Sequence, residues 1–245
     1  MDISLQLYSI KEEAEENFAH ALEMTEKAGY QGVEFAGYYG KTPGELEELL
    51  AKYHLKPVST HAGMNRFCEH LDEEINYAKK LGYKMIVCPW SDCKTEAETV
   101  ENARFLEACA QKAAAEGIVI GYHNHNHEFK RFGDRLIMDI LLENMPSVQF
   151  EPDVFWIAHA GVDPVTYIKP LAAAGRICAI HAKELAREGG KNVYIGEGKI
   201  DFAGIAALCP PSRYPYIVEQ ESYSTDHFDG ISKSYRNLHK IISAC

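Results

Sequence analysis

The sequence predicts an α/β protein built as a single (β/α)8 barrel, and two observations carry this prediction. Short apolar runs alternate with helical segments about eight times along the 245 residues, and no linker interrupts the alternation. Alternation of this kind is typical of a parallel sheet with right-handed crossovers. A chain of about 250 residues is also the usual length of one such barrel. We therefore expect one TIM-barrel domain over residues 1–245.

The expected strands are short runs rich in β-branched and other apolar residues, which favour extended structure. They cover residues 3–7, 32–35, 57–61, 84–88, 118–122, 148–151, 177–181 and 216–219. No glycine-rich phosphate loop follows the first of these runs. The sequence therefore favours a closed barrel over a doubly wound nucleotide-binding sheet.

The segments between these runs repeat apolar residues with helical spacing, and their ends carry helix signals. Gly29, Gly82 and Gly117 are expected to stop three helices, and Pro43 lies in the first turn of another. Pro170 is expected to interrupt or kink its helix. The expected helices cover residues 12–28, 43–53, 69–81, 95–116, 135–145, 164–174, 202–208 and 228–243.

The acidic composition disfavours a polynucleotide substrate. The chain has 25 Lys and Arg residues against 36 Asp and Glu, a formal net charge of −11, which repels a phosphate backbone unless the site is locally basic. No apolar run approaches the roughly 20 residues of a membrane span, and the first residues show no signal peptide. The seven cysteines are scattered, without a C-x-x-C pair, as is typical of reduced thiols. We expect a cytoplasmic protein that binds neither nucleic acid nor membrane.

A histidine-rich segment follows the fifth expected strand. His123, His125 and His127 lie within nine residues, with Glu128 beside them, directly after an apolar run. Imidazoles and a carboxylate at the carboxyl end of a strand are the groups that a divalent metal or a proton-transfer site requires. The alternative is a polar loop that is rich in histidine but binds nothing.

Polar side chains also follow most of the other expected strands, at the end where a barrel of this type places its active site. A charge among the apolar layers of a strand is costly unless it is paired or bound to metal. Mixed oxygen and nitrogen ligands suit Mn2+, Mg2+, Co2+ or Zn2+. The candidate residues are Glu34, His61, Asp153, His181, Lys183, Glu219 and Glu221.

Each of these candidates has a structural alternative. Asp153 precedes residues 154–160 and is well placed to cap a helix there. His181 can bond to the backbone, and Glu219 and Glu221 share one face of a strand that can emerge into solvent. Aromatic residues near the strand ends either wall a sugar pocket or pack in the core. They are Tyr8, Phe35, Trp90, Phe155 and Trp156.

Six motifs, taken in their order along the chain, carry a resemblance to a known family. They are YHNHNHEF at 122–129, DVFW at 153–156, AGVDP at 160–164, HAKE at 181–184, GEGKIDF at 196–202 and VEQE at 218–221. Single pieces are weak, but the ordered set resembles the sugar phosphate isomerase/epimerase family, whose members share a xylose isomerase-like barrel. The resemblance spans nearly the whole chain.

The resemblance implies one divalent metal ion held from strands five to eight. Carried over residue by residue, the implied ligands are Glu128, Asp153, His181 and Glu219. The strand-five position departs from the family pattern, because the usual glutamate at the strand end is here replaced by Tyr122 or His123. Either Glu128 reaches back from the loop or a histidine takes its place. Glu184 likewise stands where the family has the aspartate of a His-x-Lys-Asp motif, a change expected to affect a substrate contact rather than the metal.

The resemblance also implies an enzyme, namely a metal-dependent sugar or sugar phosphate isomerase or epimerase. Such enzymes move a proton next to a carbonyl through an enediolate, with a metal that polarises the carbonyl. Glu128 and Glu219 are the implied proton-transfer pair on opposite faces of the substrate. The further catalytic candidates are His123, His125 and Lys183. The candidate substrate contacts are Glu34, His61, Trp90, Trp156 and Glu221.

Three other functions fit the same sequence. A keto-sugar or inosose dehydratase would use a histidine of the cluster to protonate a leaving hydroxyl. An AP-endonuclease-like nuclease shares the barrel by family analogy but requires a basic groove. A non-catalytic sugar-binding barrel would hold its ligand without metal. Apart from the nuclease, each hypothesis expects a small-molecule sugar, keto-sugar or sugar phosphate as the partner. The sequence is also compatible with a homo-oligomer.

Overall fold

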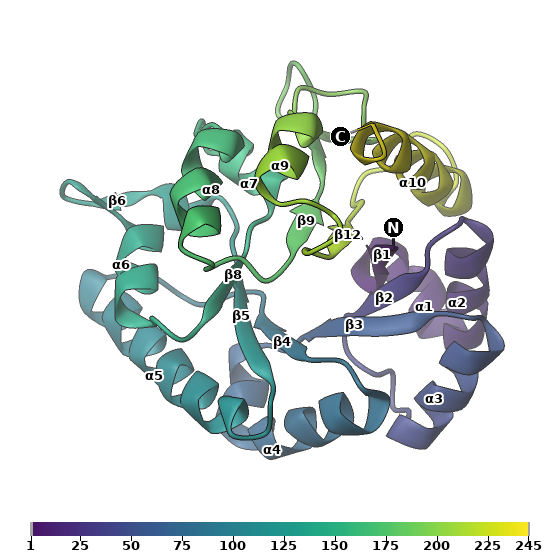
Figure 1. Cartoon of the computed structure of the whole chain (residues 1–245), viewed down its shortest axis with the longest axis horizontal. Coiled ribbons are helices and arrows are strands. Elements are labelled where there is room, and N and C mark those ends of the chain that lie inside the picture. The colour runs from purple at the N-terminus through teal and green to yellow at the C-terminus, as the bar shows by residue number, and fades with distance from the viewer. Residues whose placement is uncertain (1, 245) are drawn as a thin grey trace.

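The computed structural model describes residues 2–244, and its main feature is a ring of eight parallel strands (Figure 1). The order along the sheet is β8-β5-β4-β3-β2-β1-β12-β9, and every pairing between neighbours is parallel. The strands are β1 (Ile3–Gln6), β2 (Gly32–Phe35), β3 (Lys56–His61), β4 (Met85–Cys88), β5 (Val119–His123), β8 (Gln149–Glu151), β9 (Ile180–Ala182) and β12 (Tyr216–Val218). The prediction of a (β/α)8 barrel is confirmed.

The ring closes through a seam between β8 and β9 rather than through a continuous ladder. These two strands form the ends of the hydrogen-bonded sheet. Isolated bridges join them, one between Phe150 and Ile177 and one between Asp153 and His181. The Cys178 N–H also donates to the Phe150 carbonyl at 2.9 Å. The barrel is therefore nearly closed, and its sparsest strand pairing lies at this seam.

Helices connect successive strands and surround the barrel (Figure 1). They are α1 (Lys11–Glu16), α2 (Phe18–Lys27), α3 (Pro43–Lys52), α4 (Met64–Leu81), α5 (Glu96–Ala114), α6 (Ile137–Asn144), α7 (Val154–His159), α8 (Pro164–Ala173), α9 (Phe202–Leu208) and α10 (His227–Ile242). Polar side chains begin several of them: Thr42 forms a capping box with Glu45 at α3, and Thr95 caps α5. These caps satisfy N–H groups that have no partner within the helix.

Two of the predicted helices differ most from the structure in their boundaries. The helix predicted over 12–28 is broken at Asn17, whose side chain accepts from the His20 N–H at 3.2 Å and so begins α2. The helix predicted from residue 69 begins earlier, at Met64, and contains a kink at His70. It ends at Gly82, where φ is 84°, a left-handed conformation that glycine adopts without strain.

Two short antiparallel ribbons, which the sequence did not predict, extend from the barrel. One pairs β6 (Arg131–Phe132) with β7 (Arg135–Leu136), and the other pairs β10 (Glu184–Leu185) with β11 (Asn192–Val193). Each strand is two residues long, which is too short to show an alternating pattern. The second ribbon follows β9 directly and therefore lies at the carboxyl end of the barrel.

The apolar core divides into two regions. The larger one fills the space between the strands and the surrounding helices. The smaller one lies inside the barrel, since its members come from β4, β12 and the approach to β9, which are not all neighbours in the sheet. This amino-side cluster consists of Met85, Ala179 and Ile217, with Val58 and Cys178 packed against them. Strand alternation places His181 and Glu219, two residues beyond Ala179 and Ile217, on the same inward face.

Two further expectations concern the cysteines and the membrane. Each cysteine within residues 2–244 is a free thiol. None of the helices in that range combines the length and the apolar character that a bilayer crossing requires.

Candidate metal centre

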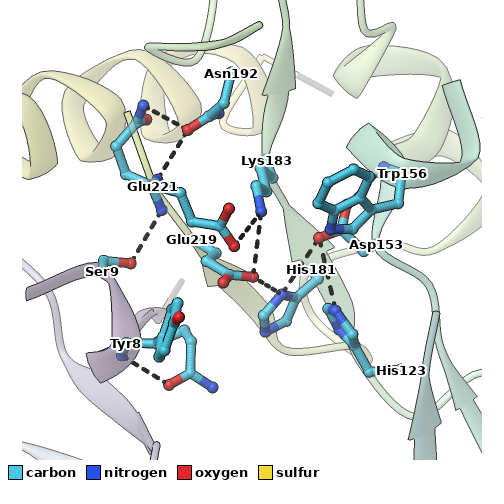
Figure 2. Close-up of polar contacts among 12 residues, drawn as sticks. Tyr8, Ser9, His123, Asp153, Trp156, His181, Lys183, Asn192, Glu219 and Glu221 are labelled. Carbon is cyan, nitrogen blue, oxygen red and sulfur yellow. Dashed lines mark hydrogen bonds and ion pairs between the residues drawn. The ribbon is translucent and has the colours of Figure 1, made fainter. Parts of the chain in front are cut away.

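Four side chains from four strands converge at the carboxyl end of the barrel, as Figure 2 shows. His123 ends β5 and His181 lies within β9, while Asp153 and Glu219 follow the ends of β8 and β12. One nitrogen or oxygen of each lies within 4.8 Å of the others, and all four residues are buried. We call these four residues the ligand group. Parallel strands end at one rim of a barrel, so residues distant in sequence meet there.

The spacing within the ligand group fits a shared cation better than direct hydrogen bonds. His123 Nε2 lies 3.8 Å from Asp153 Oδ2, and His181 Nδ1 lies 3.9 Å from the same oxygen. Both separations exceed hydrogen-bonding range. They are nevertheless short enough for both atoms to contact one ion at about 2.0–2.2 Å. His181 Nδ1 is also 3.1 Å from Glu219 Oε2, without the alignment of a hydrogen bond.

Unpaired buried atoms in the ligand group support the same interpretation. Asp153 Oδ2 and His181 Nδ1 are both buried and lack a hydrogen-bond partner. An unpaired buried polar atom costs about 1–3 kcal/mol, so two that face each other require another partner. Carboxylate oxygens and imidazole nitrogens together suit Zn2+, Mn2+ or Co2+. The residues present therefore fit a divalent ion.

Asp153 serves two purposes with its two oxygens. Oδ1 accepts from the Trp156 N–H at 3.0 Å and caps α7, which confirms the helix-cap alternative for this oxygen. The Asp153 N–H donates to Asn124 Oδ1 at 3.0 Å, which fixes the backbone after β8. Oδ2 is left to face His123 and His181. The cap therefore orients the carboxylate toward the ligand group.

A second set of acids and imidazoles lies deeper in the barrel, beneath the ligand group. This inner cluster consists of Glu34 on β2, His61 on β3 and Glu151 on β8, and both glutamates are 0% exposed. His61 Nε2 is 2.9 Å from Glu151 Oε2 and 3.1 Å from Glu34 Oε2. His181 Nε2 is 2.7 Å from Glu34 Oε2. These are hydrogen-bond distances, so shared protons are sufficient to hold the inner cluster together.

The two buried glutamates of the inner cluster differ in acidity. Burial raises the pKa of Glu34, but the neighbouring His61 and His181 outweigh it and lower that pKa to about 2. Burial, together with the charge of Glu34, raises the pKa of Glu151 to about 7. Glu151 was not among the candidates that the sequence indicated. Its place two residues before Asp153, on the same face of an extended segment, is the signal that could have found it.

Lys183 is a buried cation beside the ligand group. Its Nζ lies 2.7 Å from Glu221 Oε1 and 3.9 Å from Glu219 Oε2. The same atom lies 4.9 Å from the centre of the Trp156 ring and 5.1 Å from that of Phe155. Burial lowers the pKa of Lys183, but the nearby carboxylates outweigh it and raise that pKa above its usual value. Lys183 is therefore charged and balances part of the acidic site.

A cleft of about 300 Å³ opens over this rim of the barrel. It is lined by Tyr8, Ala36, His61, Pro89, His123, His125, Glu219 and Glu221. This volume is at the small end of the range for ligand pockets. Of the predicted substrate contacts, His61 and Glu221 line the cleft. Glu34 lies beneath it, with its oxygens occupied by neighbouring side chains.

Two tryptophans flank the histidine-rich segment. Trp90 is 47% exposed, and its ring centre lies 4.9 Å from that of His125 and 4.1 Å from that of His127. Trp156 lies 5.3 Å from His125 on the other side. Burial lowers the pKa of His125 to about 4, so its imidazole is neutral at pH 7. The predicted contacts Trp90 and Trp156 therefore stand beside the cleft rather than in the apolar core.

Glu128 lies outside the ligand group, although the resemblance implied that it is a ligand. Its oxygens accept from the Tyr122 hydroxyl at 2.8 Å and from the His125 N–H at 2.9 Å. His123 stands at the strand-five position instead, which is the second of the alternatives that the sequence left open. Burial outweighs the Tyr122 hydrogen bond and raises the pKa of Glu128 to about 7. Glu128 braces the histidine-rich loop from below.

Glu184, which departs from the family pattern, has a local role. Its carboxylate accepts backbone N–H bonds from Leu185 at 3.0 Å, Gly196 at 3.1 Å and Ile200 at 3.0 Å. The side chain is 1% exposed. It ties β10 to the loop before α9, and so fixes the rim next to Lys183.

The sequence of this chain is similar to one known protein family. A family model described as xylose isomerase-like TIM barrel matches residues 22–240, which is most of the chain. A comparison with curated proteins finds no significant match.

Several solved structures share this fold. A sugar phosphate isomerase/epimerase from Parabacteroides distasonis has a TM-score of 0.84 at 23% identity, over 98% of this chain and 95% of that one. An L-ribulose 3-epimerase has a TM-score of 0.76 at 18% identity, over 100% and 95%. The IOLI protein, whose structure holds a zinc atom, has a TM-score of 0.76 at 16% identity, over 100% and 99%. At these identities the likeness concerns the fold alone.

Proposed function

We propose, from the premise that the chain belongs to the xylose isomerase-like TIM barrel family, that it is a divalent-metal-dependent isomerase or epimerase of a small sugar. The observation that carries the proposal is the ligand group, in which two carboxylates and two imidazoles converge beside a cleft. This rim is where barrels of this type place their chemistry. The names of two similar structures, a sugar phosphate isomerase/epimerase and an L-ribulose 3-epimerase, supply the reaction class.

The ligand group would hold one divalent ion, with Mn2+, Mg2+, Co2+ and Zn2+ as the candidates. Such an ion supplies Lewis-acid polarisation of a substrate carbonyl when it is bound. Asp153 and Glu219 contribute two negative charges, and His123 and His181 contribute neutral nitrogens. In this proposal His123 replaces Glu128 as the ligand from strand five.

Two side chains on the cleft are free to move protons because they lie outside the ligand group. His125 lines the cleft from the segment after β5, and Glu221 lines it from the segment after β12. Lys183 holds the Glu221 carboxylate at 2.7 Å, and Asn192 Oδ1 accepts from the Glu221 N–H at 2.9 Å. We assign to these two groups the removal and the return of the proton next to the carbonyl. This pair replaces the expected pair of Glu128 and Glu219.

The cleft favours an uncharged sugar over a sugar phosphate or a polynucleotide. Among the described residues that line it there is no lysine or arginine. Lys183, the nearest candidate phosphate ligand from the sequence, is already paired with Glu221. The net charge of −11 acts in the same direction against nucleic acid.

A deuterium-exchange assay tests the proposal. The chain is loaded with Mn2+ and incubated with a panel of ketopentoses, ketohexoses and keto-inositols in D2O. Deuterium should enter at the carbon next to the carbonyl without loss of water, stop when a chelator is added, and resume when the ion is restored. Elemental analysis of the purified chain should find one ion for each chain.

The other functions predict different results in the same assay. Loss of water from a keto-inositol or keto-sugar would identify a dehydratase instead. Sugar binding that survives chelation, without any exchange, would identify a non-catalytic binding barrel. Cleavage of DNA at an abasic site, retained at physiological salt, would support the nuclease. Exchange that continues in fully chelated protein would contradict the metal-dependent mechanism.

A further inference from the structure

We propose that Glu34 is a positioning residue that holds His181 in the single tautomer able to bind a metal ion, and that Gln6, itself oriented by the Tyr8 N–H, fixes Glu34 in turn. The inference rests on the proposed function, because it treats His181 as a ligand. Glu34 was expected to contact substrate, but it is 0% exposed and lies beneath the cleft. Its surroundings therefore require a different explanation.

The first step is the orientation of Gln6 at the end of β1. The Tyr8 N–H donates to Gln6 Oε1 at 3.0 Å. A backbone N–H can only donate, so the amide oxygen of Gln6 must face Tyr8. The amide nitrogen then faces the opposite way and donates to Glu34 Oε2 at 2.6 Å. The usual ambiguity between amide oxygen and nitrogen is thereby removed.

The second step concerns the protonation of the Glu34 carboxyl group. Ser59 Oγ donates to its other oxygen, Oε1, at 2.6 Å. Donors on both oxygens stabilise the ionised form of a carboxyl group. An ionised carboxylate can only accept. Of its two imidazole neighbours, His61 Nε2 at 3.1 Å is hydrogen-bonded to Glu151. The donor to Glu34 must therefore be His181 Nε2 at 2.7 Å.

The third step follows from the chemistry of imidazole. A neutral histidine that carries its proton on Nε2 has its lone pair on Nδ1. His181 Nδ1 is the atom that faces the ligand group, 3.1 Å from Glu219 Oε2 and 3.9 Å from Asp153 Oδ2. The arrangement is a carboxylate–histidine–metal triad, in which the outer carboxylate fixes both the tautomer and the direction of the ring.

A competing explanation for these contacts is a second metal site, which would combine part of the inner cluster with His123 and His181. Ligand atoms of His61, His123, Glu151 and His181 also lie within 4.8 Å of one another. An ion there would have to bind a lone pair on His181 Nε2. That nitrogen instead carries the proton that it donates to Glu34. The 2.9 Å distance between His61 Nε2 and Glu151 Oε2 is likewise that of a direct hydrogen bond. The number of ions bound by each chain separates the two explanations.

The test measures metal affinity in full-length variants by Co2+ titration, followed by visible absorption. Glu34→Gln keeps one acceptor but loses the charge, and Glu34→Leu loses both. We expect about 10-fold weaker binding for the first variant and about 100-fold for the second, the range found when an outer partner of a metal-bound histidine is removed. Gln6→Leu should weaken binding less than either variant, since it acts through Glu34.

The matched control is Glu74→Gln, another buried glutamate with two side-chain partners. Glu74 is 3% exposed and accepts from the Tyr38 hydroxyl at 2.7 Å and from Arg66 Nε at 2.6 Å, on α4. Its replacement should lower the unfolding midpoint of the metal-free protein but leave the Co2+ affinity of the folded protein within twofold. A general effect of losing a buried carboxylate would instead weaken binding in both positions.

Nitrogen-15 spectra of histidine-labelled, Zn2+-loaded protein supply a direct readout of the tautomer. His181 should show a slowly exchanging proton on Nε2 in the wild type, and that proton should exchange fast in Glu34→Leu. A proton on Nδ1, unchanged affinity in Glu34→Leu, or a second ion that disappears in His61→Ala would each overturn the inference. A wild-type chain that binds no divalent ion would instead contradict the proposed function itself.

Discussion

The two halves of the barrel interior are held together by different forces. The amino-side cluster of Met85, Ala179 and Ile217 is apolar and buried, so its burial stabilises the fold. The carboxyl half carries the ligand group and the inner cluster, whose buried charges cost free energy unless they are paired. One segment of chain therefore serves both purposes, since Ile217 on β12 and Glu219 directly after it are two residues apart. Stability and chemistry are separated by height in the barrel, not by element.

The largest effect is expected from the carboxyl half, in Asp153→Asn. The amide oxygen of asparagine can still cap α7, but an uncharged amide replaces the oxygen that faces the ligand group. Metal affinity should fall by more than about 100-fold, beyond the loss typical of outer-sphere partners, and turnover should disappear. Calorimetric titration with Mn2+ measures the affinity, and the metal-free protein should remain as stable as the wild type.

The matched control for this variant is Asp163→Asn. Asp163 caps α8 through the Thr166 N–H at 2.8 Å but lies on an exposed surface away from the ligand group. It should leave metal affinity unchanged. Full activity of metal-free Asp153→Asn would remove the distinction between the two halves.

The opposite outcome is expected in the amino half, from Ile217→Ala. Ile217 is 0% exposed, and truncation of a buried isoleucine to alanine costs about 2–5 kcal/mol. The free energy of unfolding, measured by urea denaturation in the presence of chelator, should fall by this amount. The metal affinity of the folded fraction should change less than twofold. A loss of affinity that exceeds the loss of stability would show that the halves are coupled.

A smaller, pH-dependent effect is expected for Glu128→Gln. The folded-state pKa of Glu128 is raised to about 7 from an ordinary value of 4.5, so the folded protein binds its proton more tightly than the unfolded chain does. The contribution of Glu128 is fully present below pH 4.5 and is lost as the pH rises toward 7, by up to about 3 kcal/mol. The stability of the wild type should therefore fall relative to Glu128→Gln across this window. Parallel curves for the two proteins in urea denaturation at pH 5 and pH 7.5 would contradict the prediction.

The smallest effect is expected outside the barrel interior, at Trp90. Because its ring is 47% exposed, Trp90→Ala should change the free energy of unfolding by no more than about 0.5 kcal/mol. An aromatic contact with substrate is worth about 0.5–1.5 kcal/mol, so the KM should rise about 2- to 10-fold with kcat little changed. Trp90→Phe keeps a ring in this place and should recover most of the difference. An unchanged KM in Trp90→Ala would remove Trp90 from the substrate site.

The sequence was informative where the chemistry follows a local pattern. The alternation of strand-like and helical segments predicted the barrel, because apolar residues repeat with a different spacing in strands than in helices. Asp153, His181 and Glu219 were selected because each lies at or after the end of an apolar run, and parallel strands bring those ends together. The choice between His123 and Glu128 depended on the path of one loop. The Tyr122 hydroxyl, which draws the Glu128 carboxylate away, has no signature in sequence.

The inner cluster and the seam depended on distant partners. Glu34 is bonded to Gln6, Ser59 and His181, which approach from three other strands. No single-sequence pattern gives the register of strands that meet only after folding, so its burial beneath the cleft was not predicted. The joining of β8 and β9 by isolated bridges in place of a ladder also depends on how the ring closes, which is a property of the whole sheet.

The seam gives the ligand group a mechanical consequence. Asp153 and His181 face each other across the opening between β8 and β9, where one bridge joins their backbones. An ion bound by both side chains would therefore hold the two edge strands together. Metal binding and closure of the barrel at the seam then become a single equilibrium. Amide protons along this edge should exchange more slowly with solvent when the ion is bound.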